Sequence, residues 1–187
     1  MKFYSSSSLL LFLIFCQFYP PKGNSDTILH RQHSARTKQG ETRRLIVSIK
    51  TDKSVYGVAD SLLLETAIEN VGKEKIALYG DLSWGMSSSL SLWIRDSKGK
   101  DVESTFLDDE LTPPPTSRDQ FFYLQPGHFF GVRRNDAISS LNIAKPGKYT
   151  LTVEYHSPIP RDFAFGMDIW SREDESVESP PVAIEIR

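Results

Sequence analysis

The stretch Ser61–Lys73, SLLLETAIENVGK, decides the fold class of this chain. Every second residue from Leu62 to Ile68 is apolar or a threonine, and the positions between them include Glu65. A period of two is typical of a β-strand with one face toward a core. The run ends in Asn-Val-Gly-Lys, so we expect a tight hairpin turn in which Gly72 has a positive φ.

The same pattern recurs along the chain. Alternating apolar residues predict further strands that begin at Leu45, Ile76, Leu90, Phe121, Phe129, Tyr149 and Val182. Turns rich in Gly and Pro separate several of them, and no window shows a sustained 3.6-residue repeat. The sequence therefore predicts an all-β fold, a two-sheet antiparallel immunoglobulin-like β-sandwich of about 7–9 strands over residues 45–187.

The N-terminal region has the composition of an export signal. Lys2 precedes an apolar segment, Leu9–Phe18, which ends at a proline pair. This order is typical of a signal peptide, here expected over residues 1–25, and the segment is too short to span a membrane. Residues 26–44 are basic and poor in apolar side chains, so a disordered tether is expected. The predicted location is extracytoplasmic, periplasmic or secreted.

Cys16 is the only cysteine and lies inside the apolar segment. Phe15 occupies the position where a lipoprotein signal has a small residue, so an ordinary cysteine is favoured over a lipid anchor at Cys16. After cleavage the chain would have no thiol, which excludes disulfides, cysteine-based zinc sites and thiol catalysis in the mature protein.

Charge and motifs argue against several classes of function. A formal net charge of −2 and a pI of about 6.1 argue against a nucleic-acid partner. The chain has no His-Glu-x-x-His motif and no Gly-x-Ser-x-Gly elbow, and its four histidines lack a metal-ligand spacing apart from the pair in the tether. We expect a non-enzymatic protein with no catalytic residues, no cofactor and no metal site.

Two loops combine aromatic residues with glycine, Tyr79–Met86 and Phe163–Trp170. End loops carry function in many sandwiches because the sheets hold them rigidly. The candidate binding residues in these loops are Trp84, Met86, Phe163, Phe165 and Trp170. In the alternative interpretation the same side chains cap the core. Burial of Trp84 and Trp170 would remove the main support for binding.

A third candidate surface is the acidic run Asp108, Asp109 and Glu110. Three consecutive carboxylates lack the spaced oxygen ligands of a calcium loop, so a solvated loop is the simpler interpretation. The prolines at 113–115 would stiffen the segment in an extended conformation, from which the acidic residues could contact a partner.

The order of several turn and strand sequences resembles a known group of modules. These sequences are Asp52–Tyr56, Ile68–Gly72, Leu124–Gly127 and Lys145–Leu151. Together they resemble exported bacterial immunoglobulin-like modules, and they are also similar to the BsuPI type of proteinase inhibitor and to the β-sandwich that precedes the catalytic domain of deuterolysin-type metallopeptidases. The resemblance covers most of residues 45–187 and implies the fold; no inhibitory residue carries over.

Three functions remain open at this point. The first is binding of a protein or cell-envelope partner through the end loops. The second is proteinase inhibition, in which Ile159–Arg161 or the loop Asp108–Pro115 enters a protease cleft. The third is carbohydrate binding on exposed aromatic rings.

Overall fold

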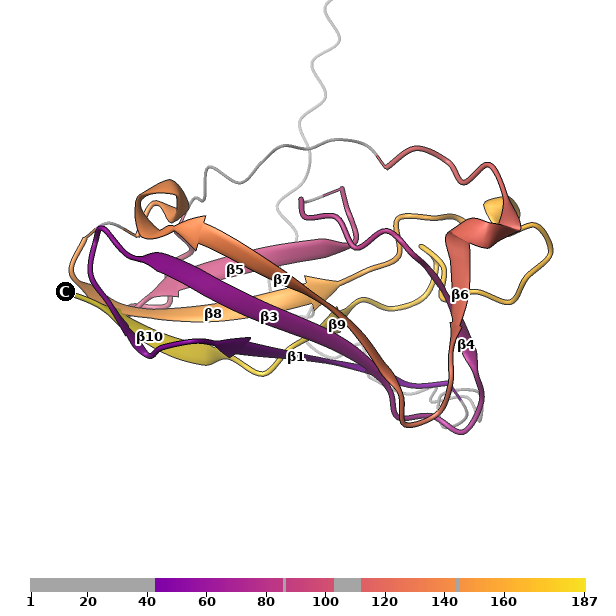
Figure 1. The fold of residues 1–187 in the computed structure, drawn as a ribbon, viewed down its shortest axis with the longest axis horizontal. Helices are drawn as coiled ribbons and strands as arrows, with labels where there is room; N and C mark the ends of the chain where they lie inside the picture. The colour runs from indigo at the N-terminus through magenta and orange to yellow at the C-terminus, as the bar shows by residue number, and fades with distance from the viewer. Residues whose placement is uncertain (1–42, 86, 103–111, 144) are drawn as a thin grey trace, which may run out of the picture. The chain divides into compact units, whose positions relative to one another are not determined.

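The computed structural model describes residues 43–85, 87–102, 112–143 and 145–187 (Figure 1). These ranges form strands and three short 3-10 helices, with no longer helix in them. The strands are β1 Leu45–Thr51, β2 Val55–Tyr56, β3 Ser61–Asn70, β4 Ile76–Tyr79, β5 Leu90–Asp96, β6 Phe121–Leu124, β7 Phe129–Ala137, β8 Gly147–Tyr155, β9 Val177–Glu178 and β10 Val182–Ile186. The 3-10 helices are η1 Arg118–Gln120, η2 Ile138–Leu141 and η3 Arg161–Phe163.

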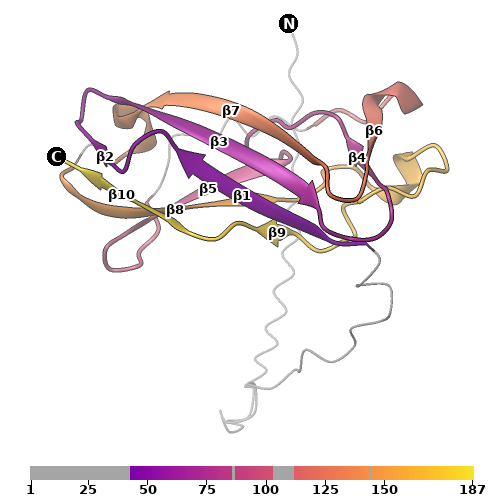
Figure 2. The same cartoon turned by 60° about the horizontal axis from the view of Figure 1, so that its bottom comes forward.

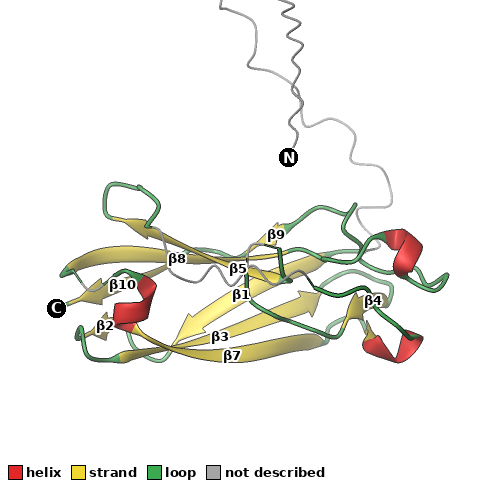
Figure 3. Cartoon of the chain, turned by 90° about the horizontal axis from the view of Figure 1, so that it is seen from above, coloured by secondary structure: helices red, strands yellow, loops and turns green. Residues whose placement is uncertain are grey.

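The strands form two facing sheets and one separate pair. One sheet has the order β1-β3-β7, and the other has the order β2-β10-β8-β5 with β9 added beside β8. Figure 2 shows β1, β3 and β7 running side by side, and Figure 3 shows them in one layer with β5 and β8 in the other. Among the described strands, β4 and β6 pair with no other strand than each other, and an isolated bridge joins Ala77 of β4 to Ile169. The predicted all-β two-sheet sandwich is therefore confirmed.

The residues that decided the fold class behave as their alternation predicts. On β3, Leu62, Leu64, Thr66 and Ile68 are all buried, whereas the side chains between them are half-buried. Buried residues of β1 and β8 belong to the same core. Successive residues of a strand point to opposite faces, so alternate residues of each strand reach this core. Burial of these side chains between the two sheets provides the main favourable free energy of folding.

The turn after β3 differs from the prediction. Strand β3 pairs with β1 and β7, while β4 pairs with β6, so the Asn-Val-Gly-Lys segment connects two sheets and does not close a hairpin. Gly72 is also absent from the glycines with positive φ, whereas Gly127 has a φ of 72°. The N–H of Gly72 instead donates to the side-chain oxygen of Asn70 at 3.0 Å. A side chain therefore shapes this turn, and the hairpin prediction was wrong.

The core has three clusters along the sandwich. Two fill the space between the main sheets and share Ile49 and Leu92 as neighbours. The third lies beneath the β4–β6 pair and includes Tyr79, Phe121 and Ala164. This third cluster anchors the long loop between β8 and β9, which carries several of the predicted site residues.

The predictions for residues 1–42 lie outside the described residues, so the signal peptide at 1–25, the lipid anchor and most of the tether remain predictions. Arg44 at the end of the tether is described, and its carbonyl oxygen accepts the N–H of Val71 at 2.9 Å. Within the described ranges, no helix is both long enough and apolar enough to cross a membrane.

Candidate functional site

Four of the predicted site residues lie outside the described residues. They are Met86 in the first aromatic loop and the acidic run Asp108, Asp109 and Glu110. The predicted role of the acidic loop therefore remains a prediction, and the site is built from the other four residues.

Trp170 belongs to the core. It is only 6% exposed and packs in the same cluster as Leu78 and Tyr155. Its backbone N–H donates to the carbonyl oxygen of Ala77 at 2.9 Å, which ties the loop to β4. The guanidinium of Arg43 lies 5.9 Å from the ring centroid. Its ring is covered by its own protein, so the prediction that Trp170 binds a partner loses its support.

Trp84 is half-buried and packs against the core cluster between the sheets. The guanidinium of Arg134, on β7, lies 5.2 Å from its ring centroid, close enough for a cation–π interaction. A salt bridge of 2.6 Å between Arg134 and Asp136 positions that guanidinium. Trp84 therefore has one side against the core and an arginine beside its ring, which leaves little ring surface for a ligand.

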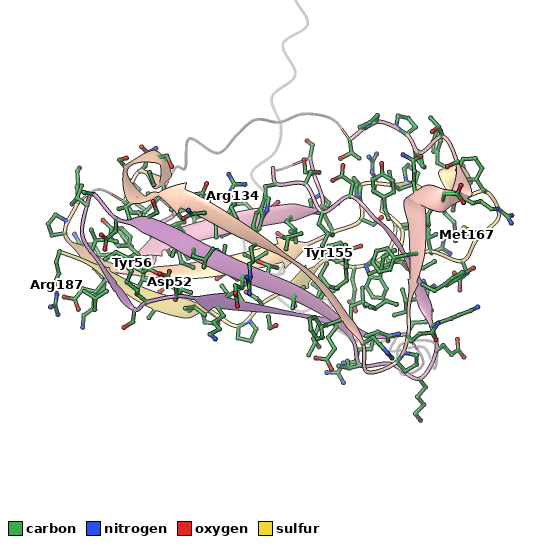
Figure 4. The ribbon with its side chains drawn as sticks, viewed as in Figure 1. Asp52, Tyr56, Arg134, Tyr155, Met167 and Arg187 are labelled. Carbon is green, nitrogen blue, oxygen red and sulfur yellow. The ribbon has the colours of Figure 1, made fainter. Side chains whose placement is uncertain are left out.

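Phe163 and Phe165 are exposed on the loop between β8 and β9. Their exposed fractions are 48% and 40%, and Ala164 between them is fully buried in the third cluster. Met167 follows in the same loop, and Figure 4 shows it at the end of the sandwich that carries β4 and β6. The buried Ala164 fixes the loop while both rings reach solvent.

The backbone at Phe165 has an unusual conformation. Phe165 has a φ of 53° and Gly166 has a φ of 74°, and the N–H of Met167 donates to the carbonyl oxygen of Ala164 at 2.9 Å. Two consecutive positive φ values within such a turn define type I′, whose first central position is usually Asn, Asp or Gly. A bulky side chain in this region costs roughly 1–2 kcal/mol.

Arg118, on η1, holds this strained turn. Its Nε donates to the carbonyl oxygen of Phe165 at 3.1 Å, and its Nη2 donates to the same oxygen. The η1 segment is itself anchored, because the N–H of Gly80 donates to the carbonyl oxygen of Gln120 at 2.8 Å. Phe165 therefore lies in a turn held by Arg118 and by the buried Ala164, and Phe163 precedes that turn at the end of η3.

The segment Ile159–Arg161, predicted as a reactive loop of an inhibitor, is tied into the fold. Ile159 is buried, and Arg161 starts a 3-10 helix. The Arg161 guanidinium forms a salt bridge of 3.3 Å with Asp174 and donates to the hydroxyl of Ser171 at 3.2 Å. A protease cleft would need this segment extended and its arginine unpaired.

Sequence reasoning missed two residues, Arg118 beside the Phe165 turn and Phe129 on strand β7. Arg118 gave no signal, because its role depends on a carbonyl 47 residues away. Phe129 was assigned to a strand but not to a surface, yet it is 72% exposed, more than any other large apolar side chain described. No group of three His, Cys, Asp or Glu residues suited to a metal ion occurs among the described residues.

No family model matches the chain, and no curated protein matches it. Among solved structures, the chain is similar to a CARDB domain from Pyrococcus furiosus, solved in complex with di-metal ions, at 14% identity over 79% of this chain and 90% of that one, with a TM-score of 0.38. It is also similar to the ApaA protein of Bordetella pertussis, at 13% identity over 78% and 96%, with a TM-score of 0.41. A β-glucosidase from Erythrobacter marinus matches at 15% identity with a TM-score of 0.36, and there the 78% of this chain that aligns spans only 16% of the enzyme.

Proposed function

We propose that this protein is an exported, non-enzymatic binding module that inserts Phe163 and Phe165 into an apolar pocket of a protein partner. The observation that carries the proposal is the strained, exposed Phe165 at a turn that Arg118 holds in place. Export is part of the proposal and rests on the composition of residues 1–25.

The strained backbone of Phe165 supports a function for this residue, because the turn could fold with a less strained residue in its place. Asn or Gly at this position would form the same type I′ turn without the steric cost. The ring of Phe165 is 40% exposed, so core packing compensates only part of that cost. Strained residues that persist at exposed loop tips are typical of binding surfaces.

The chemistry of the tip favours a protein partner. Phe163 at the end of η3 and Phe165 in the fixed turn resemble the aromatic anchors that contribute most of the free energy at protein interfaces. Preorganisation lowers the entropy lost on binding, since neither the turn nor η3 needs to fold. The charged side chains nearby, Arg161 and Asp162 on η3 and Arg118 on η1, would form the polar rim of such an interface.

Carbohydrate binding receives less support, because sugars stack on broad, accessible indole or phenol faces. Trp170 is buried, and Trp84 is half-buried beside Arg134. The indole N–H of Trp93 donates to Glu154 at 3.1 Å, and this residue is half-buried as well. Proteinase inhibition through Ile159–Arg161 would first require the Arg161 contacts to break.

The experiment is a comparison of captured proteins. The full chain and three variants, Phe163→Ser, Phe165→Asn and Tyr123→Ser, would be immobilised and incubated with a cell-envelope extract of the native host. Tyr123 is the matched control, an exposed aromatic residue on β6 outside the loop. We expect a specific partner that binds the full chain and the Tyr123 variant and is depleted at least about tenfold for both loop variants.

The same set of proteins captured by all four chains would contradict the proposal. A panel of proteases of several classes would be assayed in parallel with the full chain. Inhibition that survives Phe163→Ser but is lost in Arg161→Ala would replace the binding proposal with the inhibitor. Circular dichroism of every variant would confirm that the fold is intact.

A further inference from the structure

A second surface, separate from the Phe163 and Phe165 tip, lies along strand β7. This strand is at the edge of the β1-β3-β7 sheet. The N–H of Asn70 donates to the carbonyl oxygen of His128, and the N–H of Ile138 donates to that of Asp60, each at 3.0 Å. Backbone groups of even-numbered β7 residues therefore point toward β3, and those of Phe129, Gly131 and Arg133 point away from the sheet.

These outward backbone groups have no partner among the described residues. At the β5 edge of the other sheet, outward backbone groups do have partners. The N–H of Val102 donates to the carbonyl oxygen of Ile94 at 2.8 Å, and the N–H of Leu90 donates to that of Ser83 at 3.0 Å. Unpaired edges invite a further strand, and proteins usually protect them with charges. In β7 the inward Arg134 and Asp136 protect one half only.

The unprotected half of β7 is apolar. It comprises Phe129, Phe130, Gly131 and Val132. Phe129 is 72% exposed on the outer face. On the inner face, Phe130 and Val132 are only half-buried, although both pack against the core between the sheets. A strand added here would extend that core as well as the sheet.

The outer face beside Phe129 has a hollow of about 490 Å³. The pairing registers explain it, because Ser48, Ala67 and Gly131 form one row of small residues across the three strands. The next row is Lys50, Glu65 and Arg133, in which Arg133 and Glu65 form a salt bridge of 2.8 Å. The hollow thus lies between the ring of Phe129 and a charged row.

We propose that β7 pairs antiparallel with β7 of a second copy of this chain, about a two-fold axis at Gly131, and joins two sheets into one of six strands. An axis at Arg133 is excluded, because it would place two guanidinium groups opposite each other. With the axis at Gly131, each Phe129 lies opposite Arg133 of the other copy, where ring and guanidinium attract. Phe130 then lies opposite Val132 of the other copy on the inner face.

This register makes the edge self-complementary. The residue at the axis has no side chain, so the two strands meet without a clash on the outer face. Both ring–guanidinium contacts and both Phe130–Val132 contacts form by symmetry, as in an isologous interface. Because only Phe129–Arg133 of each chain overlap, the dimer is of the small, transient class.

Sedimentation velocity over a concentration series tests the proposal with the full chain. We expect a dimer that forms reversibly as the concentration rises, and a dissociation constant at least about tenfold larger for Phe129→Ser. The matched control is Tyr123→Ser, which removes an exposed aromatic residue from β6 and should leave the dimer unchanged. A monomer at every concentration up to ~1 mM would overturn the proposal.

The register has its own test in Phe129→Lys and Phe129→Glu. Both variants remove the ring, but in the dimer Arg133 of the second copy would repel the lysine and attract the glutamate. The stability of the monomer should follow the opposite order, because residue 129 lies opposite Glu69 on β3, which attracts a lysine and repels a glutamate. We therefore expect the Lys variant to be the more stable monomer and the weaker dimer, and an equal loss of dimer in both would overturn the register.

Discussion

The side-chain amide of Asn70 donates a hydrogen bond of 2.9 Å to the carbonyl oxygen of Leu124. Asn70 ends β3 and Leu124 ends β6, so this contact joins the β1-β3-β7 sheet to the separate β4–β6 pair. The same amide donates to Glu74 at 2.8 Å, and its oxygen accepts the N–H of Gly72. Asn70 is fully buried, and its side-chain hydrogen bonds satisfy both of its polar atoms.

We expect Asn70→Ala to lower the free energy of unfolding by about 3 kcal/mol. The substitution removes three hydrogen bonds of a fully buried side chain, to the carbonyl oxygens of Leu124 and Glu74 and from the N–H of Gly72. Each such bond contributes about 0.5–1.5 kcal/mol. Urea denaturation followed by circular dichroism measures the change. Asn135→Ala, at an exposed position on β7, serves as the control and should stay within about 0.5 kcal/mol of the wild type.

The strain at Phe165 can be isolated by comparing two substitutions at the same site. Both Phe165→Ala and Phe165→Asn remove the ring, but asparagine tolerates the positive φ better than alanine does. We expect the Asn variant to be more stable than the Ala variant by about 1 kcal/mol. At Phe163, which has no positive φ, the Asn variant should not be the more stable one. Thermal unfolding of the Ala and Asn variants at positions 165 and 163 measures these differences. Equal stability of the two variants at 165 would contradict the strain at Phe165.

The sequence predicted those features that depend on neighbours along one strand. The alternation in Ser61–Lys73 was enough to identify the buried face of β3, because side chains alternate strictly along a strand. The turn that follows could not be predicted, since the side chain of Asn70 bonds to Leu124, which lies 54 residues further along the sequence. Local sequence contains no information about such a partner, and Asn-Val-Gly-Lys is also typical of hairpins.

Exposure of the aromatic residues was the least predictable property. Trp170 and Phe165 lie in one loop, yet Trp170 is buried beside Arg43 and β4 while Phe165 reaches solvent. The difference depends on which residues the loop meets in three dimensions. For Phe129, alternation identifies its face, but its exposure follows from the position of β7 at the sheet edge.

Gly131 is expected to be intolerant of any side chain. A Cβ at this position would lie 2.3 Å from the carbonyl oxygen of Thr66, so β3 and β7 would have to move apart. We expect Gly131→Ala to lower the free energy of unfolding by about 2 kcal/mol. Gly57→Ala is the control, because its Cβ would approach nothing closer than 3.9 Å. Equal midpoints in urea for both variants would contradict the close approach of the two strands.

The corner between β1 and β2 should control the response to acid. The hydroxyl of Tyr56 donates to the carboxylate of Asp52 at 2.7 Å, and Figure 4 shows the two residues side by side. Burial alone would raise the pKa of Asp52, but hydrogen bonds from Tyr56 and from the N–H of Leu63 lower it. This stabilisation is present above the unfolded-state pKa of 3.8 and is lost as the pH falls through the folded-state pKa. Tyr56→Phe should therefore begin acid unfolding at a higher pH, as tryptophan fluorescence would measure.

The same pair predicts the response to alkali. Burial, followed by the hydrogen bond to Asp52, raises the pKa of Tyr56 from 10.0 to about 12. The folded protein therefore keeps this proton over a range in which the unfolded chain releases it, so the free energy of unfolding falls as the pH rises from about 10 to 12. Burial raises the pKa of Tyr79 and Tyr155 as well, so the wild type loses stability through three tyrosines. Tyr56→Phe should show a shallower fall between these pH values, measured as urea midpoints. An unchanged slope would mean that Tyr56 is not shielded from solvent in solution.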